Sequence, residues 1–473
     1  MQLCWLRNDL RSYDNSALWH ASQTGPVVAV YLISPATWLA HHDAAIKVDF
    51  WLRNLATLQT QLTQRNIPLR LIDIDSWSMA AAALIDLARE LNAEGIWFND
   101  EYGDHEQQRD AKVQRRFEEA GLHCRRFTDQ LLFEPGSLLT QTGTMFKVFS
   151  RFRVQAYQQL HHSLPSCVPA PARQPNTGIA STLIQQKIPL SVNGFSPPSS
   201  QQQSLWPAGE EFAQQRLQRF CTQRLLDYQQ QRNRPDLDTT GSLSAYLNSG
   251  VLSPRQCLHA ALVHNQGEFD SGNAGIVCWI NQLLWREFYK HILACYPDVS
   301  KQRAFRPKMD AIPWRDDPEA LQRWQQGKTG IPIINAAMRQ LLATGWMHNR
   351  LRMLCAMLLS KNLLIDWRQG ERWFLQHLID GDLAANNGGW QWCASTGTDA
   401  APYFRIFNPL SQSRKFDPRG DFIRRWLPLL RPLNTRQIHE PSATERIACH
   451  DYPAAMVDLN ASRKQAINIF SQQ

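Results

Sequence analysis

The sequence predicts an α/β first domain followed by an all-α second domain. Over residues 1–130, short apolar runs alternate with longer amphipathic segments, a pattern typical of a doubly wound parallel sheet. From about Glu210 onward, the apolar residues recur at helical period. The charge divides at the same place, because residues 1–130 carry a net charge of −4 and the rest of the chain +12.

The expected strands of the first domain are its short apolar runs. They are Gln2–Leu6, Val27–Ile33, Pro68–Ile74, Gly95–Phe98 and Leu122–Phe127. The amphipathic segments between them predict helices at Val48–Gln64, Met79–Leu91 and His105–Ala120. No GxGxxG follows the first run, so the fingerprint of dinucleotide-binding sheets is missing.

Residues 131–209 are expected to connect this domain, residues 1–130, to a helical domain over 210–473. Over 161–209, prolines mingle with Ser, Gln and Asn, a composition that resists packing. The helices expected beyond it are Phe212–Arg232, Ile276–Tyr296, Ile333–Thr344, His348–Asp366 and Glu371–Asp380.

Composition excludes several classes of protein. No apolar run approaches the roughly 20 residues that span a bilayer, and the charged N-terminus is unlike a signal peptide. The ten cysteines form no CxxC pair and no zinc spacing with histidine. We therefore expect reduced thiols in a cytoplasmic protein with no membrane partner.

Three motifs are weak on inspection. Gly327–Thr329 imitates the end of a phosphate-binding loop, but Gln322 stands where that loop needs glycine. The pairs His41–His42 and His161–His162 are adjacent rather than four apart, so no metal site is predicted. No order of Ser, His and Asp suggests a hydrolase.

The basic excess beyond residue 130 suits a polyanion such as DNA. A solvated basic surface explains the charge equally well.

Tryptophan is the unusual residue of the second half. Ten of the 17 tryptophans fall between Trp279 and Trp426. In Trp346–Met353, Asn349 and Met353 are four residues apart, so a helix places them on one face next to Arg350. An amide, a thioether and a guanidinium together form a plausible wall for a flat aromatic ligand, although a Trp-rich core is the plainer explanation for any single tryptophan.

The segment Ile379–Trp392 combines aspartates, asparagines and paired glycines. These residues make a poor helix interior and a backbone that a ligand can approach closely.

Long motifs in this region resemble the photolyase/cryptochrome family. They are WMHNRLRM (Trp346–Met353), DGDLAANNGGWQW (Asp380–Trp392), TGTDAAPYFRIFNP (Thr396–Pro409), LLWREFY (Leu283–Tyr289), GKTGIPIINAAMRQL (Gly327–Leu341) and WLRNDLRSYDNSAL (Trp5–Leu18). The likeness covers nearly the whole chain and is greatest to bacterial folate-type photolyases of cyclobutane pyrimidine dimers. It implies a five-stranded α/β antenna domain, a connector and an all-α domain that binds FAD.

The resemblance assigns residues to the cofactor. Those expected to hold FAD are Tyr228, Thr240, Gly241, Ser242, Leu243, Ser244, Trp279, Arg286, Trp346, Asn349, Arg352, Asp380, Gly381, Asp382 and Asn386. Asn386 would lie beside flavin N5, where an uncharged amide suits an anionic reduced flavin. Trp390, Trp367 and Trp314 would form a chain for electrons from the buried flavin to the surface.

The resemblance also implies repair of UV-damaged DNA by a monomer. A dimer must be flipped out of the duplex to reach a buried flavin, and Trp285 and Trp392 would stack on it while Met353 packs nearby. The residues expected to contact phosphates or the dimer edge are Arg232, Gln282, Arg286, Arg350, Arg405 and Lys415.

Two positions depart from that branch. Gln282 stands where its members usually carry glutamate, and an amide can bond a thymine edge but cannot donate a proton in the same way. Glutamine there is typical of the six-four and DASH branches, but six-four enzymes have histidines where this chain has Asn349 and Met353. Ser242 replaces an arginine of many relatives, which predicts a weaker phosphate contact.

A second chromophore is expected in the first domain. His41, Glu106 and Lys301 fall where folate-type relatives hold methenyltetrahydrofolate, although His105 replaces an expected asparagine. The alternatives to dimer repair are a blue-light receptor of the cryptochrome kind and six-four repair. Only about sixty residues follow Asn408–Pro409, fewer than the long variable tail of many receptors.

Overall fold

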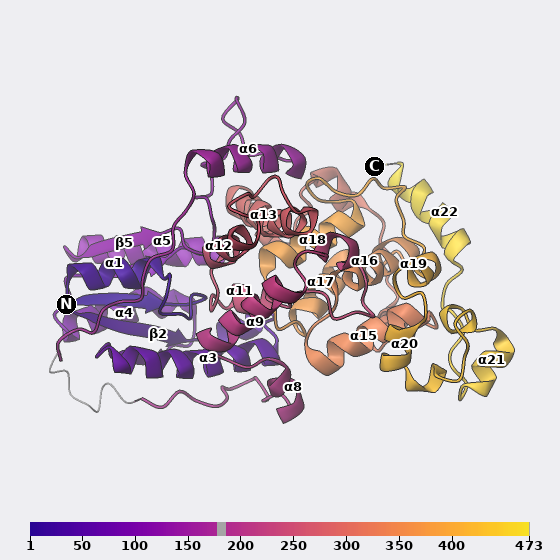
Figure 1. The fold of residues 1–473 in the computed structure, drawn as a ribbon, viewed down its shortest axis with the longest axis horizontal. Coiled ribbons are helices and arrows are strands. Elements are labelled where there is room, and N and C mark those ends of the chain that lie inside the picture. The colour runs from indigo at the N-terminus through magenta and orange to yellow at the C-terminus, as the bar shows by residue number, and fades with distance from the viewer. Residues whose placement is uncertain (177–185, 473) are drawn as a thin grey trace. The chain divides into compact units, whose positions relative to one another are not determined.

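The five predicted strands form one parallel sheet. Their bounds are β1 Gln2–Leu6, β2 Val27–Ile33, β3 Leu69–Asp73, β4 Gly95–Asn99 and β5 His123–Phe127. They lie in the order β3-β2-β1-β4-β5, and each neighbouring pair is parallel (Figure 1). The computed structural model describes residues 1–176 and 186–472, and in it the predicted α/β architecture is confirmed.

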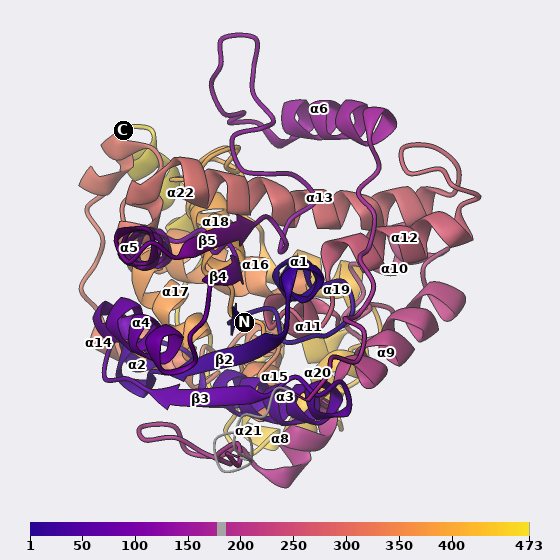
Figure 2. The same cartoon turned by 90° about the vertical axis from the view of Figure 1, so that its left-hand side faces the viewer.

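Helices cover both faces of the sheet. Figure 2 shows α4 (Ala80–Glu90) and α5 (Asp104–Glu119) on one face, and α1 (Ser16–Thr24) and α3 (Ala45–Gln64) on the other. Trp5 and Phe98 of the sheet pack with apolar side chains of α4 and α5. The helices α1 and α2 (Pro35–Ala40) were missed by the sequence prediction, because both are short and α2 follows directly on β2.

The chain forms two compact units. Unit 1 comprises Met1–Leu226, Gly241–Pro297 and Ile379–Gly381, and unit 2 comprises Asp227–Thr240, Asp298–Leu378 and Asp382–Gln473. Unit 1 therefore contains the sheet and several helices that follow it in the chain. These are α6 (Phe149–His162), α8 (Ser200–Leu205), α9 (Glu210–Gln223), α11 (Ser244–Asn248), α12 (Pro254–His264) and α13 (Ala274–Cys295).

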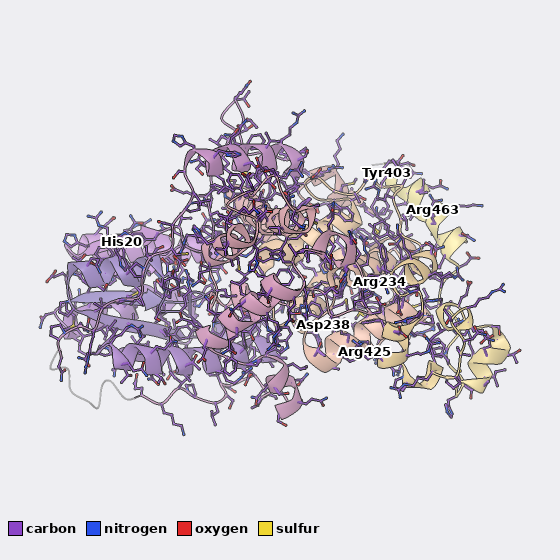
Figure 3. All side chains as sticks on the ribbon, viewed as in Figure 1. His20, Arg234, Asp238, Tyr403, Arg425 and Arg463 are labelled. Carbon is purple, nitrogen blue, oxygen red and sulfur yellow. The ribbon has the colours of Figure 1, made fainter. Side chains whose placement is uncertain are left out.

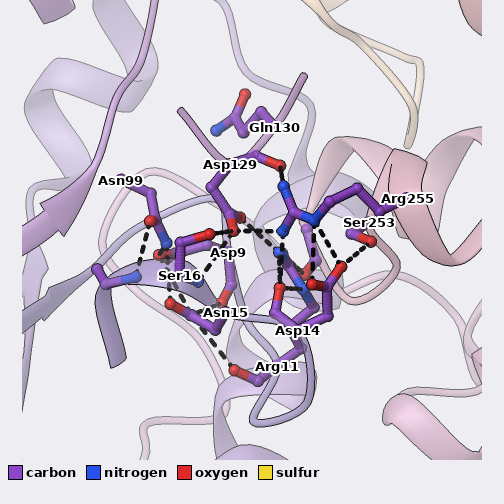
Figure 4. A network of polar contacts seen from close by, with 12 residues as sticks. Asp9, Arg11, Asp14, Asn15, Ser16, Asn99, Asp129, Gln130, Ser253 and Arg255 are labelled. Carbon is purple, nitrogen blue, oxygen red and sulfur yellow. Dashed lines mark hydrogen bonds and ion pairs between the residues drawn. The ribbon is translucent and has the colours of Figure 1, made fainter. Parts of the chain in front are cut away.

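A buried network of charged residues fills the carboxyl edge of the sheet (Figure 4). Arg255 of α12 donates to Asp129 at 2.8 Å and to Asp14 at 3.0 Å, and Arg11 pairs with Asp129. Burial alone would raise the pKa of Asp129, but the two guanidinium groups hold it at about 2. This edge is where open α/β sheets bind nucleotides. In this protein the charged network at that edge instead holds α12 to the sheet.

Part of the expected connector is helical. In α6, Phe149, Phe152, Ala156 and Leu160 recur at helical spacing and are buried. The helix packs on α13, so its apolar stripe outweighs the polar composition of the surrounding segment.

Unit 2 is all-α. Its helices are α10 (Tyr228–Gln231), α14 (Pro318–Gln325), α15 (Pro332–Thr344), α16 (Asn349–Met357), α17 (Trp367–Leu375), α18 (Leu383–Ala394), α19 (Pro409–Phe416), α20 (Asp421–Trp426), α21 (Ala443–Ala448) and α22 (Leu459–Phe470). Trp324, Trp367 and Trp390 belong to its buried core.

Two predicted helices are broken. The pattern over His348–Asp366 gives α16, a π-helical turn at Leu358–Asn362 and then Leu364 with φ +55°. The pattern over Phe212–Arg232 gives α9 and the separate short helix α10. In both cases the apolar period continues through a backbone break, which periodicity cannot detect.

The expectation that Ile379–Trp392 makes a poor helix interior was wrong, since Leu383–Ala394 is the helix α18. The Asp382 side chain caps it by accepting from the backbone N–H of Ala385 at 2.9 Å. Asn387 is anchored by its bond to the Glu371 carboxyl group at 2.9 Å. Capping and tertiary contacts therefore outweigh the low helix propensity of the asparagines and glycines.

Candidate functional site

In unit 1, four of the predicted site residues lie along α13. Trp279 is buried and its ring centroid lies 5.2 Å from that of Phe220 of α9. Gln282 donates to the carbonyl of Cys278 at 3.2 Å, and Arg286 donates to the carbonyls of Gln130 at 2.5 Å and Leu247 at 3.5 Å. Residues 279, 282 and 286 share one helix face, while Arg286 ties that face to two backbone segments.

Trp285 is supported from behind by an aromatic ring. Phe149 of α6 stacks on it with centroids 3.8 Å apart and planes 13° from parallel, while Phe288 meets its edge at 5.8 Å. Trp285 itself is half-buried. A flat indole held in this way presents its remaining surface in a fixed orientation.

The segment Gly241–Ser244 lies before and at the start of α11, and Ser242 has φ +47°. That left-handed conformation is uncommon outside glycine, so the contacts around Ser242 must hold this loop in its shape. The carbonyl of Gly381 accepts from Lys47 of α3 at 2.6 Å and from Asn248 of α11 at 3.3 Å. These bonds fix Asp380 and Gly381, with Asp380 buried.

In unit 2, α16 carries Asn349, Arg350, Arg352 and Met353 in its first two turns. The Arg350 side chain donates to Asn233 at 2.8 Å and lies 4.7 Å over the ring of Phe416. Burial lowers the pKa of Arg350, and nearby Arg232 lowers it further. The Arg352 Nε donates to the carbonyl of Met347 at 2.8 Å.

At the N-terminus of α18, Asn386 has one polar atom bonded and one without a partner. Its Nδ2 donates to the carbonyl of Glu371 at 3.0 Å, which orients the amide. Among the described residues its Oδ1 receives no hydrogen bond, although Asn386 is half-buried. An oriented acceptor of this kind suits an N–H group of a ligand.

A buried chain of polar groups supports Asn386, and the sequence prediction missed it. Glu371 accepts from Asn387 at 2.9 Å, and Asn387 in turn accepts from Gln391 at 2.8 Å. Burial raises the pKa of Glu371 to about 7. The sequence did contain a signal for this chain. Glu371 stands among the aromatic residues of α17, at a position that the helical period assigns to the core.

The three tryptophans of the expected electron chain are in unit 2. Trp390 of α18 and Trp367 at the start of α17 are buried in one core cluster, and Trp314 packs against that cluster. The indole of Trp390 rests on Gly370, three residues after Trp367 in α17. The backbone N–H of Arg315, the residue after Trp314, donates to the carbonyl of Leu364 at 2.7 Å, three residues before Trp367.

Neither indole nitrogen of Trp314 and Trp367 has a hydrogen-bond partner among the residues that the structure describes. Trp324, which the sequence prediction did not single out, also lies 6.1 Å from Trp390 between ring centroids. Its Nε1 donates to the carbonyl of Cys355.

The remaining predicted residues of unit 2 lie on other elements. Trp392 of α18 packs, partly buried, against the core, Trp346 precedes α16, and Arg232 lies 5.7 Å over the ring of Tyr228. Arg405 is exposed in the loop that carries Tyr403, labelled at the surface in Figure 3. Lys415 is exposed on α19, Lys301 ends a short 3-10 helix, and Thr240 is half-buried.

The expected antenna residues of unit 1 form a cluster. The rings of His41 and His105 are joined by a bond of 2.8 Å between their nitrogens, and His41 lies 3.9 Å from Glu106. Trp77 meets the His41 ring at 4.8 Å, and Arg109 lies 4.3 Å over Trp77. Burial raises the pKa of Glu106 to about 6 and lowers that of both histidines.

Two searches of the described residues found no site. No group of three or more His, Cys, Asp or Glu in that part of the chain could hold a metal ion. None of its helices has the length and apolar character needed to cross a membrane.

Comparison with known proteins decides the family. Residues 2–172 match the DNA photolyase family, and residues 279–472 match the FAD binding domain of DNA photolyase. The chain is 43% identical to the deoxyribodipyrimidine photo-lyase of Vibrio cholerae over 99% of both proteins. The chain belongs to the DNA photolyase family. It is 42% identical to the photolyase of Escherichia coli K12 over 98% of this chain and 97% of that protein.

Solved photolyase structures have the same fold. A bacterial class III photolyase from Agrobacterium tumefaciens superposes with a TM-score of 0.88 at 32% identity, over 100% of this chain and 97% of that one. A cryptochrome from Synechocystis superposes with a TM-score of 0.88 at 28% identity, over 99% of both chains.

The photolyase residues present in this chain fit FAD. Asn386 offers an unbonded amide oxygen for an N–H of the flavin ring, and the carbonyl-anchored Arg286 and Arg352 supply the positive charge that a pyrophosphate requires. The half-buried Gly388 and Gly389 follow Asn386, and a Cβ on Gly389 would meet nothing within 4 Å.

Proposed function

We propose that this chain repairs cyclobutane pyrimidine dimers in DNA by light-driven electron transfer with FAD. The observation that carries the proposal is Asn386, an amide held by the carbonyl of Glu371 with its oxygen left to accept a bond. Full-length identity of 43% to a deoxyribodipyrimidine photo-lyase supports it.

When bound, FAD would supply the redox chemistry, which is the light-driven loan of one electron to the dimer. The protein orients and tunes this exchange. Asn386 accepts from the flavin ring without adding negative charge, so an anionic reduced flavin is tolerated. The residues Tyr228, Thr240, Gly241–Ser244, Trp279, Arg286, Trp346, Asn349, Arg352 and Asp380–Asp382 hold the remainder of the cofactor.

Aromatic side chains bind the flipped dimer. Trp285, stacked on Phe149, and Trp392 of α18 provide flat apolar surfaces, and Met353 packs beside them. Gln282 bonds a thymine edge. The basic residues Arg232, Arg286, Arg350, Arg405 and Lys415 contact phosphates, so affinity falls as salt rises.

Trp390, Trp367 and Trp314 carry an electron inward when the bound flavin is oxidised. Two contacts support this order: Trp390 packs on Gly370 of the helix that begins with Trp367, and the N–H of Arg315, next to Trp314, donates to the carbonyl of Leu364. Each indole is an oxidisable π-system. This path restores the reduced cofactor without taking part in repair itself.

We also propose that the chain binds a folate antenna, methenyltetrahydrofolate, through His41 and Glu106, with Lys301 engaging its glutamate tail. The buried Glu106 carboxyl suits the donor groups of a pterin ring. His105 bonds to His41 at 2.8 Å and takes the place of an asparagine of folate-type relatives. The ten cysteines are free, in keeping with a cytoplasmic enzyme, which we propose acts as a monomer.

The deciding experiment is a light-dependent repair assay on an oligonucleotide with one thymine dimer. Protein with reduced FAD should restore the thymines under blue light and not in the dark. The variant Trp285→Ala should bind the damaged strand more weakly by about 1–3 kcal/mol. The matched control Trp19→Ala, a half-buried tryptophan of α1, should bind as the unaltered chain does. Equal affinity of Trp285→Ala would remove this residue from the site.

The variant Gln282→Glu tests the effect of glutamine at a position where related photolyases usually carry glutamate. If the glutamine limits repair, the variant should split more dimers per absorbed photon. An unaltered yield would mean that another group supplies the interaction.

A blue-light receptor is the second candidate, because the chain superposes on a cryptochrome over 99% of its length. The two functions share the flavin and the tryptophans. Photoreduction without any repair of thymine dimers or six-four lesions would favour the receptor, and repair of the six-four lesion alone would favour that branch.

A further inference from the structure

Lys361 is a buried basic residue that the proposed repair chemistry does not use. It is 0% exposed and lies in the π-helical turn Leu358–Asn362 between α16 and α17. Lysine is rarely buried without a charged partner, and a π-turn inside a helix frequently marks a functional position. An apolar side chain of similar length would fill this space at lower cost.

The amine is held by uncharged groups. Its Nζ donates to the hydroxyl of Ser395 at 2.9 Å, and that hydroxyl donates to the carbonyl of Ala401 at 2.7 Å. Ser395 ends α18 in the left-handed conformation with φ +63°. No carboxylate forms an ion pair with Lys361 among the described residues.

An aromatic ring joins Lys361 to the outer tryptophan. The amine lies 3.3 Å from the ring centroid of Phe470 in α22. The same ring meets Trp314 edge-on, with centroids 5.9 Å apart and planes at 73°. Lys361 and Trp314 therefore contact the same phenyl group.

We propose that Lys361 controls the stability of the positive charge left on Trp314 when an electron passes inward. This inference rests on the proposed electron chain. The electron moves from Trp314 through Trp367 and Trp390 to the oxidised flavin. An external thiol reductant then neutralises the positive charge on Trp314 by giving up one electron, or the first electron returns to Trp314. A protonated amine opposes the positive indole and favours return, whereas a neutral amine lets the separated charge persist.

The titration range fits this role. Burial lowers the pKa of Lys361 to about 7, so its charge changes across physiological pH. Because the pKa is below the ordinary value, the amine is protonated below about pH 7 and neutral above it. The amine and the Trp314 ring centroid lie 3.3 Å and 5.9 Å from the same phenyl centroid, so they are less than about 10 Å apart. Within that separation, at an effective dielectric constant of about 20, a unit charge alters the population of a charged state by roughly tenfold or more.

Among the described residues, no carboxylate, arginine or other lysine is found to act on the charge of Lys361. The π-turn packs against α16, α17, α18 and α22. In the described chain, the titratable group that acts on Lys361 is Cys393 of α18, and burial raises the pKa of this thiol to about 12, so it stays neutral. The basic residues of α22, Arg463 and Lys464, are exposed (Figure 3 labels Arg463).

Ionisable groups on the other two helices are engaged elsewhere. On α17, Arg368 pairs with Asp366 and Asp310, and Glu371 accepts from Asn387. On α16, Arg350 donates to Asn233 and Arg352 to the carbonyl of Met347.

The test is the pH profile of charge recombination in the full chain loaded with oxidised FAD. After a light flash, the lifetime of the tryptophan radical should rise roughly tenfold from about pH 6 to about pH 8.5. Lys361→Met should give the long lifetime at every pH, and Lys361→Arg the short one, because arginine stays charged. Lys464→Met, a matched exposed lysine on α22, should keep the profile of the unaltered chain.

An unchanged profile in Lys361→Met would overturn the inference. If that variant does not fold, Ser395→Ala replaces it: loss of the acceptor for the ammonium should move the midpoint to lower pH, and a fixed midpoint would equally refute the role. Trp314→Phe separates the two proposals. If it leaves photoreduction intact, the electron chain itself is wrong and the inference falls with it; if it blocks photoreduction while Lys361→Met changes nothing, Lys361 alone is excluded.

Discussion

The indole of Trp390 in α18 lies directly on Gly370 in α17: a Cβ on Gly370 would come within 2.1 Å of Cη2 of Trp390 and 2.6 Å of Cδ2 of Leu359. Both neighbours are buried in the core of unit 2. Glycine at this position therefore allows α17, which begins with Trp367, to approach Trp390, its neighbour in the proposed chain.

Gly370→Ala should force Trp390 from its place. Overpacking of a filled core costs about 1–3 kcal/mol, so urea unfolding of the apoprotein should occur at lower concentration, and photoreduction of oxidised FAD should slow. Gly389→Ala is the control, because nothing lies within 4 Å of a Cβ there and alanine favours the helix. If Gly370→Ala were as stable as the unaltered chain, the close contact would be wrong.

Asn386→Asp should make the anionic reduced flavin harder to form. The substitution keeps the shape of the side chain but places a negative charge beside the ring, which disfavours a second anion. We expect the equilibrium between oxidised and reduced FAD to shift roughly tenfold or more toward the oxidised form. Spectroelectrochemical titration measures this, with Asn386→Ser as the uncharged comparison. An equal potential in all three proteins would place the flavin ring away from Asn386.

Lys415→Met should reduce the salt dependence of DNA binding. Each phosphate contact contributes about −0.9 to the slope of log K against log salt, so loss of one contact should make the slope shallower by about that amount. Binding to dimer-containing duplex over a salt series gives the slope. Lys464→Met, on α22, should leave it unaltered, and the same slope in Lys415→Met would remove this lysine from the DNA surface.

Lys361→Met should stabilise the apoprotein most below neutral pH. The pKa of Lys361 is lowered to about 7 from about 10.5 in the unfolded chain, so the unfolded state binds more protons between these values. The cost of burying the lysine is thus greatest below about pH 7 and is relieved as pH rises toward about 10.5. Below neutral pH the variant should gain several kcal/mol, as judged by denaturant unfolding against pH. A gain that does not change with pH would mean that the lysine is not titrating in the fold.

Arg255→Met should destabilise unit 1 more than any surface arginine. Removal of this guanidinium leaves Asp14 and Asp129 buried with less compensation (Figure 4), and breaking such a pair costs about 3–5 kcal/mol. Arg116→Met removes an exposed pair with Glu119 and should cost less than about 1 kcal/mol. Thermal unfolding compares the two, and equal losses would contradict a structural role for the network.

Much of the fold followed from local pattern. Each strand was predicted within two residues of its observed bounds, because a strand buried between two layers of helices reads as a short unbroken apolar run. The helices α13 and α15 were likewise marked by their period. The helices α1 and α2 were not, because they are short, and α6 was not, because it lies in the segment that was expected to be a connector.

The candidate site was predicted unevenly. The motifs around Asn349, Asp380 and Asn386 indicated a flavin pocket, and they lie on the helices and turns of two different units. Glu371 and Lys361 were not predicted, because a carboxylate or an amine in a helical sequence is ordinarily at the surface. Their burial depends on where the helices pack.

The sequence by itself determined the order of strands and helices, the family and the residue types available to a flavin and to damaged DNA. These are properties of local period and of side-chain chemistry, which are present in the linear chain. Tertiary structure decided that an asparagine- and glycine-rich segment is helical, that Trp390 rests on Gly370, and that a lysine lies beside Phe470. Such contacts join residues that are far apart in the chain. Only packing buries these side chains, and burial is what shifts the pKa of a group such as Lys361.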